Sequence, residues 1–170
     1  MYIAGDRQNE GVFPLWSVAE NLTIGVLKQL TRRGLVNLGT EETIAVEWRE
    51  KLNIKVPAVT DAITSLSGGN QQKVLVARAL ACQPDVVLLD DPLRGVDVQT
   101  KNELYAEVRT RIRSGCSFVW FTTENAELAV CDRIYVFNQG AITDMFAQSE
   151  FTEDRLIRAS FKEGLVDVRT

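Results

Sequence analysis

The sequence has no histidine among its 170 residues. This absence excludes Ser-His-Asp and Cys-His nucleophile systems, histidine-ligated zinc and a histidine general base. Any chemistry must therefore use carboxylates, hydroxyls, amides or backbone groups. Long apolar runs are also missing: the longest lie near Val86–Leu89 and Phe118–Phe121, too short to span a bilayer. We expect no signal peptide, because the chain becomes polar within its first six residues.

Cysteine and positive charge are both limited. The three cysteines are widely spaced without a CxxC pair, which predicts reduced core thiols in a cytosolic protein. The 19 Lys and Arg residues against 23 Asp and Glu give a net charge of −4 without a long basic run, so a nucleic-acid or anionic-lipid partner bound by bulk charge is not expected. What remains is an ordinary globular composition, 45% hydrophobic and 25% charged, of a length that suits one compact domain.

The first part of the chain predicts a helical lobe over residues 17–65. Ser17 and Glu20 form the S-x-x-E pattern of a capping box. The helix that follows would place Leu22, Val26 and Leu30 on one face. A second helix is expected from Thr40 through Leu52, and residues 53–65, which include Pro57, are expected to be irregular.

From Leu66 onward the pattern alternates between strands and helices. We expect helices near 70–81, 98–113, 125–130 and 152–161, strands at 86–89 and 117–122, and a hairpin of 133–137 with 141–146. The continuous apolar runs at 86–89 and 117–122 predict strands buried on both faces of a parallel sheet. The fold class is therefore α/β, with the helical lobe added to it.

Two segments have the composition of ligand sites. Leu66–Gln72 places a serine and two glycines at a helix start, where free backbone N–H groups and the helix dipole favour an anion or phosphate. Taken alone, a Gly-Gly helix entry with Ser as its cap is more often only structural. Val86–Pro92 puts Asp90 and Asp91 at the carboxyl end of a strand, where open α/β sheets bind ligands. Asp90 would suit Mg²⁺, and Asp91 could orient or deprotonate a water, unless both belong to a turn that caps the next helix.

Two further loops follow the same logic. Arg94–Asp97 lies between strand and helix, and Asp97 is a good N-cap for the helix at Val98. Thr122–Glu124 comes directly after a strand and could also be a helix cap.

Taken together in this order, the segments resemble the C-terminal half of an ABC transporter ATP-binding cassette. Leu66–Gln72 matches the signature LSGGxQQ, Leu88–Asp90 the end of Walker B, and Gly95–Asp97 the D-loop. Asp132–Ile134 with the Asn138–Gly140 turn matches the strands after the switch region. The sequence SGGNQQKV…RGVD is similar to that of the second cassette in tandem importers for simple sugars such as ribose or galactose. The resemblance covers roughly residues 2–147.

The resemblance implies roles for individual residues. Ser67, Gly68 and Gly69 would contact ATP held by a partner cassette, Asn70 and Gln71 would support that surface, and Asp97 would join them from the D-loop. Asp90 would assist Mg²⁺, Asp91 would occupy the position of the catalytic glutamate, and Thr123 that of the switch histidine. The expected cofactors are ATP and Mg²⁺ shared with the partner, and the expected partners are another cassette and a membrane-spanning permease.

The sequence departs from the family pattern at four places. No GxxxxGK[ST] motif, Walker A, is present. Asp91 is one methylene shorter than glutamate, and a misplacement near 1 Å can cost about 100-fold in rate. Thr123 cannot become a cation near neutral pH. The Q-loop position falls near Gly5, and Leu93 replaces the usual threonine after Pro92.

These departures predict a partial cassette that does not hydrolyse ATP alone. We expect four segments along the chain: a Q-loop-like entry segment (1–16), the helical subdomain with the signature (17–82), the Walker B, D-loop and switch part of the α/β core (83–147), and a helical tail (148–170). It would lie in the cytoplasm, held peripherally on the inner face of the plasma membrane through the permease. Half of a split or truncated active ATPase, and a non-catalytic interaction module, remain alternatives. Exposed sheet edges and apolar faces would make the isolated chain poorly soluble or self-associating.

Overall fold

The computed structural model describes residues 1–6, 10–32 and 34–162. The chain forms two compact units, Met1–Phe121 and Thr122–Thr170, which we describe separately. The four segments predicted from the sequence are defined by motifs rather than by compactness, and they stay a prediction.

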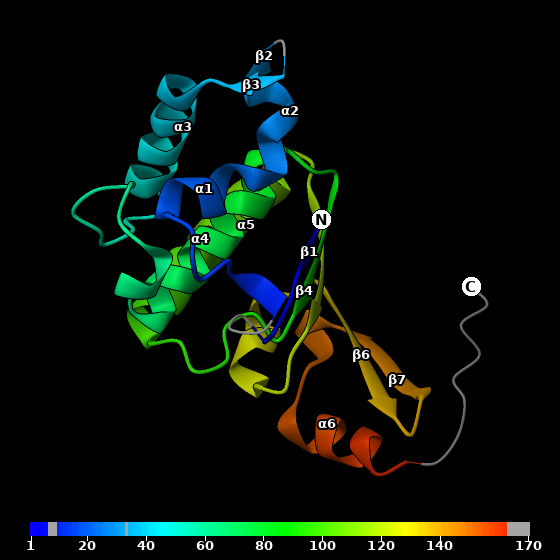
Figure 1. Ribbon diagram of the computed structural model, residues 1–170. Helices are drawn as coiled ribbons and strands as arrows, with labels where there is room; N and C mark the ends of the chain where they lie inside the picture. The colour runs from blue at the N-terminus through cyan, green and yellow to red at the C-terminus, as the bar shows by residue number, and fades with distance from the viewer. Residues whose placement is uncertain (7–9, 33, 163–170) are drawn as a thin grey trace. The chain divides into compact units, whose positions relative to one another are not determined.

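The first unit contains a parallel three-stranded sheet in the order β1-β4-β5 (Figure 1). Its strands are β1 (Tyr2–Ile3), β4 (Val86–Asp90) and β5 (Ser117–Phe121). Tyr2 pairs with Leu88, which pairs in turn with Val119, so the three strands are in register across the sheet. The prediction of parallel strands at 86–89 and 117–122 is confirmed, within one residue at their carboxyl ends.

The prediction that these strands are buried on both faces is wrong. Burial alternates along β4: Val87 and Leu89 are 0% and 5% exposed, whereas Val86 and Leu88 are 46% and 45% exposed. β5 alternates in the same way, with Val119 61% exposed. An uninterrupted apolar run therefore did not indicate two-sided burial, because within the described residues of the first unit the helices pack on one face only.

Two helices cover the buried face of this sheet. They are α4 (Gly68–Ala81) and α5 (Val98–Arg113). Val76 and Leu80 of α4, with Leu104 and Val108 of α5, enclose a small space together with the inward residues of the strands, namely Ile3, Val87, Leu89, Phe118 and Trp120. α4 begins two residues earlier than predicted, at Gly68, and α5 has the predicted bounds.

The helical lobe packs on the other side of α4. Its elements are α1 (Val18–Thr23), η2 (Ile24–Val26), α2 (Leu27–Leu30), β2 (Thr31–Arg32), β3 (Leu35–Val36), α3 (Leu38–Lys51) and η3 (Ile63–Ser65). Ser17 and Glu20 form the predicted capping box. The helix after it is broken by the 3-10 turn η2, where Gly25 lies so close to α4 that a Cβ would be 2.7 Å from Cys82 Sγ. Leu22, Val26 and Leu30 are nevertheless all buried, as predicted.

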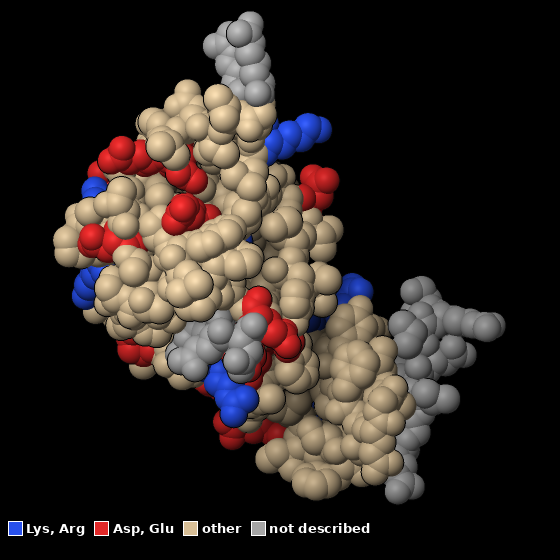
Figure 2. Space-filling model, in the orientation of Figure 1, with Lys and Arg blue, Asp and Glu red and all other residues tan. Residues whose placement is uncertain are grey.

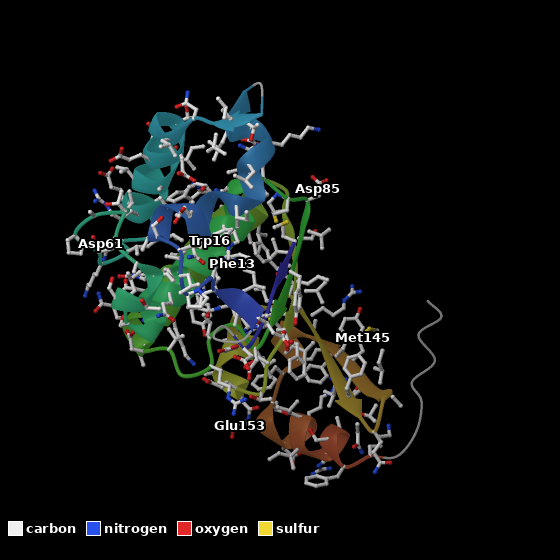
Figure 3. The ribbon with its side chains drawn as sticks, viewed as in Figure 1. Phe13, Trp16, Asp61, Asp85, Met145 and Glu153 are labelled. Atoms are coloured by element: carbon white, nitrogen blue, oxygen red, sulfur yellow. The ribbon has the colours of Figure 1, made fainter. Side chains whose placement is uncertain are left out.

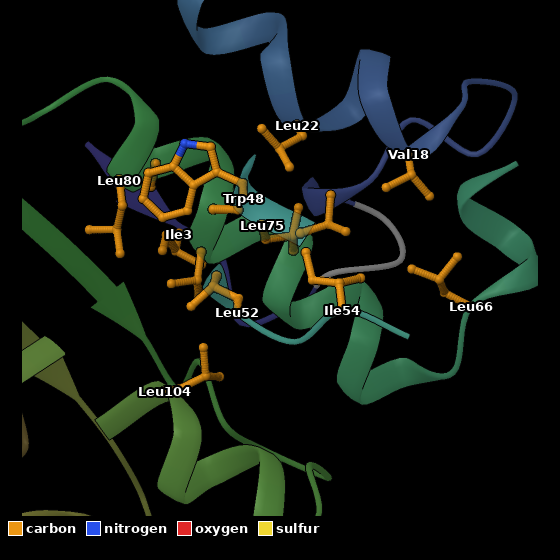
Figure 4. Packing of buried hydrophobic residues seen from close by; sticks show 14 of the residues in the cluster. Ile3, Val18, Leu22, Trp48, Leu52, Ile54, Leu66, Leu75, Leu80 and Leu104 are labelled. Atoms are coloured by element: carbon orange, nitrogen blue, oxygen red, sulfur yellow. The ribbon is translucent and has the colours of Figure 1, made fainter. Parts of the chain in front are cut away.

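The main core lies where the lobe meets α4 and the sheet (Figure 4). Trp48 of α3, 6% exposed, packs among leucines and isoleucines from α1, α4 and β1. α3 itself starts at Leu38 with Asn37 as its cap, two residues before the predicted Thr40, because the Asn37 side chain accepts a hydrogen bond from the Thr40 amide.

The second unit is a hairpin covered by a helix. Its elements are η4 (Asn125–Val130), β6 (Arg133–Asn138), β7 (Ala141–Ala147), η5 (Gln148–Glu150) and α6 (Glu153–Ser160). The predicted hairpin and the tail helix are confirmed. The turn uses positive φ angles at Gln139 and Gly140, which suit the twist of a tight hairpin.

None of the helices in the described ranges combines the length and the apolar character needed to cross a bilayer. On the face shown in Figure 2, the acidic side chains are spread over the surface among uncharged residues.

Candidate functional site: the signature turn and the strand-end carboxylates

The structure groups the predicted site residues into two clusters within the first unit. We call residues 67–71 with Asp97 the signature turn, and Gly5 with Asp90 and Asp91 the strand-end carboxylates. The first cluster lies at the N-terminus of α4, and the second at the carboxyl end of β4.

The signature turn presents an open helix N-terminus. Ser67 occupies the N-cap position of α4 in an extended conformation, but its side chain forms no capping hydrogen bond. Its Oγ instead accepts a hydrogen bond of 2.9 Å from Asn70 Nδ2. The first turn of this 14-residue helix therefore keeps backbone N–H groups that the Ser67 side chain does not satisfy, and these groups favour an anion.

Asn70 and Gln71 hold the turn in place. Asn70 Oδ1 accepts the Lys55 amide at 2.8 Å, which ties the turn to the preceding irregular segment. Gln71 Nε2 donates to the carbonyls of Ile63 and Leu66 at 3.3 and 3.2 Å. Both side chains are thus committed to neighbouring backbone, which fits the predicted supporting role better than direct ligand contact.

Asp97 joins this cluster across the start of α5. It caps that helix, accepting the Thr100 amide at 3.0 Å and the Thr100 hydroxyl at 2.8 Å. These hydrogen bonds lower the pKa of Asp97 below its ordinary value. A Cβ on Gly69 would lie 3.2 Å from Asp97 Oδ2, so glycine lets the two loops approach closely. The prediction that Asp97 is the N-cap of α5 is confirmed. Its carboxylate also lies close to Gly69 of the signature turn.

The strand-end carboxylates differ in exposure and in backbone shape. Asp90 is partly exposed, and its Oδ2 accepts a 2.8 Å hydrogen bond from the Tyr2 hydroxyl. This contact raises the pKa of Tyr2. Asp91 is only 7% exposed and has a φ of 44°, in the left-handed region that few residues other than glycine adopt. Its amide donates to the Phe121 carbonyl at 2.8 Å, which anchors the turn to β5.

Gly5 lies directly against these carboxylates. A Cβ added to it would be 2.6 Å from the Asp90 carbonyl oxygen and 3.7 Å from Asp91 Cβ. Gly5, near which the sequence predicts the Q-loop position, therefore lies next to the end of β4. No side chain fits there unless the backbone moves.

Thr123 belongs to the second unit, so its position relative to these clusters is not described. Glu124 takes the N-cap position of η4 without a side-chain capping hydrogen bond, and the neighbouring Thr122 hydroxyl accepts the Glu124 amide at 3.0 Å.

The donor groups fit the expected cofactors in kind. Asp90 offers carboxylate oxygen, the ligand type that Mg²⁺ prefers, and the first turn of α4 offers backbone N–H groups suited to a phosphate. Within the described ranges, no cluster of three or more carboxylate or thiol side chains could hold a metal by itself. Such an ion would therefore need further oxygen ligands from nucleotide or water.

Sequence reasoning missed three contributors to these clusters: the Tyr2 hydroxyl, the Thr100 side chain and the Lys55 amide. Thr100 could have been found, since it lies three residues after a predicted N-cap. Tyr2 and Lys55 are distant in sequence from the groups they contact, and no local pattern indicates them.

Comparison with known proteins decides the family. The family described as ABC transporter matches residues 3–94, more than half of the chain. This chain belongs to the ABC transporter family. The ribose import ATP-binding protein RbsA of Caldanaerobacter subterraneus is 38% identical over 159 residues, which cover 92% of this chain and 32% of that protein. The L-arabinose transport ATP-binding protein AraG of Geobacillus stearothermophilus is 32% identical over 165 residues, 96% of this chain and 32% of AraG.

The fold agrees with this family. The dimeric bacterial ABC transporter cassette MJ0796 matches with a TM-score of 0.73 at 23% identity, covering 88% of this chain and 63% of the cassette. The α/β cassette fold expected from the sequence is thus confirmed. The ABC chain described here spans about a third of the length of the curated relatives it matches.

Proposed function

We propose that this chain is an ATP-binding cassette component of a carbohydrate importer and that it contributes the signature side of an ATP site to a partner cassette. The relatives named for ribose and arabinose transport support the substrate class. One structural observation supports the assignment to the signature side of the ATP site. The Ser67 side chain does not cap the N-terminus of α4, and hydrogen bonds of the Asn70 and Gln71 side chains hold this turn in place.

In the same proposal the strand-end carboxylates belong to the ATP site on this chain's own side, which is the weaker of the two sites. Asp90 would hold Mg²⁺ through its carboxylate, and Asp91 would stand in the place of the catalytic glutamate. When bound, ATP and Mg²⁺ supply the phosphoryl group and the charge that neutralises it. Asp91 is buried on a strained turn and is shorter than glutamate, and Thr123 cannot act as a cation. These features support a chain that does not hydrolyse ATP alone, and that couples hydrolysis in a partner to sugar uptake.

The remaining parts of the proposal concern location and partners. The chain would lie in the cytoplasm, peripheral on the inner face of the plasma membrane, bound to a permease and to a second cassette.

The test pairs this chain with a cassette that carries GxxxxGK[ST], and measures phosphate release from Mg-ATP. The chain alone should show no turnover, and the pair should exceed the partner alone. Ser67→Arg should abolish that gain, since the long cationic side chain fills the open helix start. The control is Ser114→Arg, which places the same side chain at the exposed C-terminal end of α5.

Either of two outcomes would contradict the proposal. Turnover by the purified chain alone would indicate an active ATPase. A Ser67→Arg variant that stimulates the partner as well as Ser114→Arg does would indicate an interaction module without nucleotide contact.

A further inference from the structure

A buried cation lies in α4 just beyond the signature turn. Lys73 is only 3% exposed, and its Nζ donates to the carboxylate of Glu103 in α5 and, at 3.0 Å, to the carbonyl of Asn53 at the end of α3. A buried ammonium group is costly unless it is paired and hydrogen-bonded, and Lys73 is both. Its one side chain therefore joins three elements of the first unit, whose side chains Figure 3 shows along the ribbon.

Glu103 is the centre of this polar group. Its Oε1 accepts hydrogen bonds from Asn53 Nδ2 and Gln99 Nε2, both at 3.3 Å. The hydrogen bond from Lys73 lowers the pKa of Glu103 below its ordinary value. Asn53 thus contacts both members of the ion pair, because its side chain donates to Glu103 and its carbonyl accepts from Lys73.

The backbone around Asn53 is fixed by its apolar neighbours. Leu52 and Ile54 are 3% and 4% exposed and belong to the main core, as does Leu104, the residue after Glu103 (Figure 4). The Ile54 amide also donates to the Arg49 carbonyl at 2.8 Å. A contact that holds Asn53 therefore also determines the course of the chain over the next two residues.

That short segment leads directly to the signature turn. The Lys55 amide, two residues after Asn53, donates to Asn70 Oδ1 at 2.8 Å. Gly69 lies four residues before Lys73 and so shares its face of α4. This face meets α5 twice, at Thr100 beside Gly69 and at Glu103 beside Lys73.

We propose that Lys73 is a positioning residue for the signature turn. Its pair with Glu103 fixes α4 along α5, and its hydrogen bond to Asn53 fixes the segment that braces Asn70. The N–H groups at the start of α4 are then already arranged when an anion arrives, which is how fixed donors are most effective. The inference rests on the proposed function for the identity of that anion, a phosphate of ATP held by the partner cassette.

A second ion pair of α5 provides the comparison for a merely stabilising role. Lys51, at the end of α3, has its Nζ 3.6 Å from Glu107 Oε1 and 4.6 Å from the centre of the Trp48 ring. It thus links α3 to α5 as Lys73 links α4 to α5, through groups other than Asn53 and Asn70. Lys51→Met is therefore the matched control for Lys73→Met, which keeps an apolar stem and removes the charge.

Hydrogen exchange of single amides in the full chain measures the positioning directly. The Lys55 amide reports on its bond to Asn70, and the Val76 amide in the middle of α4 reports on general stability. In Lys73→Met the exchange rate of Lys55 relative to Val76 should rise about tenfold, the effect expected from loss of one hydrogen bond. The ratio should stay at the parent value in Lys51→Met and return toward it in Lys73→Arg, which keeps the charge and the donors.

Phosphate release by a partner cassette that carries GxxxxGK[ST] is the second readout. Lys73→Met should lower the maximal stimulation by about 10–100-fold, the range expected when a contacting group is misplaced by about 1 Å. The chain concentration that gives half of the maximum should change little, since the surface that meets the partner is retained. Lys73→Arg should restore the stimulation, and Lys51→Met should leave it unchanged.

Two results would overturn the proposal: an equal ratio of Lys55 to Val76 exchange in Lys73→Met and Lys51→Met, or equal maximal stimulation by these two variants. If Lys73→Met does not fold, Glu103→Gln takes its place, because it removes the charge that holds Lys73 and keeps an acceptor for Asn53. A wild-type chain that gives no stimulation would refute the proposed function instead. The exchange ratio alone would then decide whether Lys73 positions the turn.

Discussion

Replacing Gly5 by alanine tests the close approach of β1 to the end of β4. The added Cβ would lie 2.6 Å from the Asp90 carbonyl oxygen, whereas ordinary contacts of a Cβ begin near 3.4 Å. The backbone must therefore separate by about 0.8 Å just beyond the last residue pair between β1 and β4, Ile3 with Leu89. Overpacking of this kind costs about 1–3 kcal/mol.

An opposing effect reduces that cost but does not cancel it. Gly5 does not require a left-handed φ, so alanine gains about 0.4–1 kcal/mol by restricting the unfolded chain. We expect a net loss of about 1–2 kcal/mol in the free energy of unfolding. For a domain of this size that corresponds to a fall of about 2–8 °C in the melting temperature.

Urea unfolding followed by circular dichroism measures this difference. Gly39→Ala is the matched control, since a Cβ there would be 3.5 Å from Asn37 Oδ1 and would lie inside α3. Helix propensity predicts a gain of up to about 1 kcal/mol for the control. If Gly5→Ala is as stable as Gly39→Ala, Gly5 does not lie against the Asp90 carbonyl.

Three further substitutions test the first unit. Glu103→Gln removes the carboxylate that pairs with Lys73, which is 3% exposed, and should cost about 2–3 kcal/mol in denaturant unfolding. An unchanged midpoint would show that the Asn53 carbonyl, to which Lys73 Nζ donates at 3.0 Å, satisfies Lys73 without the carboxylate. Leu80→Ala in the core should cost about 2–5 kcal/mol, and a loss below 1 kcal/mol would contradict the packing between α4 and the sheet. Asp97→Ala should lower the unfolding midpoint at pH 7. Because the folded pKa of Asp97 is lowered, its stabilisation is complete above the ordinary value of 3.8 and is lost as the pH falls through the folded value, so the effect of the variant should shrink at pH 3. An equal effect at both pH values would refute the role of its hydrogen bonds with Thr100.

The order of elements in the sheet region was predictable because its signals are local. Asp97 and Ser17 set the starts of their helices through hydrogen bonds that span only three residues. The turn at Gln139 and Gly140 likewise depends on two adjacent residues. Local patterns of this kind also placed the signature turn at the start of a helix.

Other features depend on neighbours distant in sequence. The break in the helix at Gly25 results from the close approach of α4, and nothing within residues 17–30 indicates it. The one-sided burial of Val86–Asp90 depends on which surfaces are present to cover the strand, so an apolar run alone could not reveal it. In the site, the contact between Tyr2 and Asp90 spans 88 positions and was missed for the same reason.

The pairing of β1 with β4 has a consequence for synthesis on the ribosome. The N-terminal ammonium group donates to the Val86 carbonyl, 85 positions later, so the first strand of the sheet has no partner until β4 has been made. At a typical elongation rate of 5–20 residues per second, the wait is on the order of 4–17 s. During this interval the helical lobe can form from its own local contacts, whereas Ile3 stays without its core neighbours. The strand β1 thus reaches its final position only after a segment more than 80 residues further along has been made.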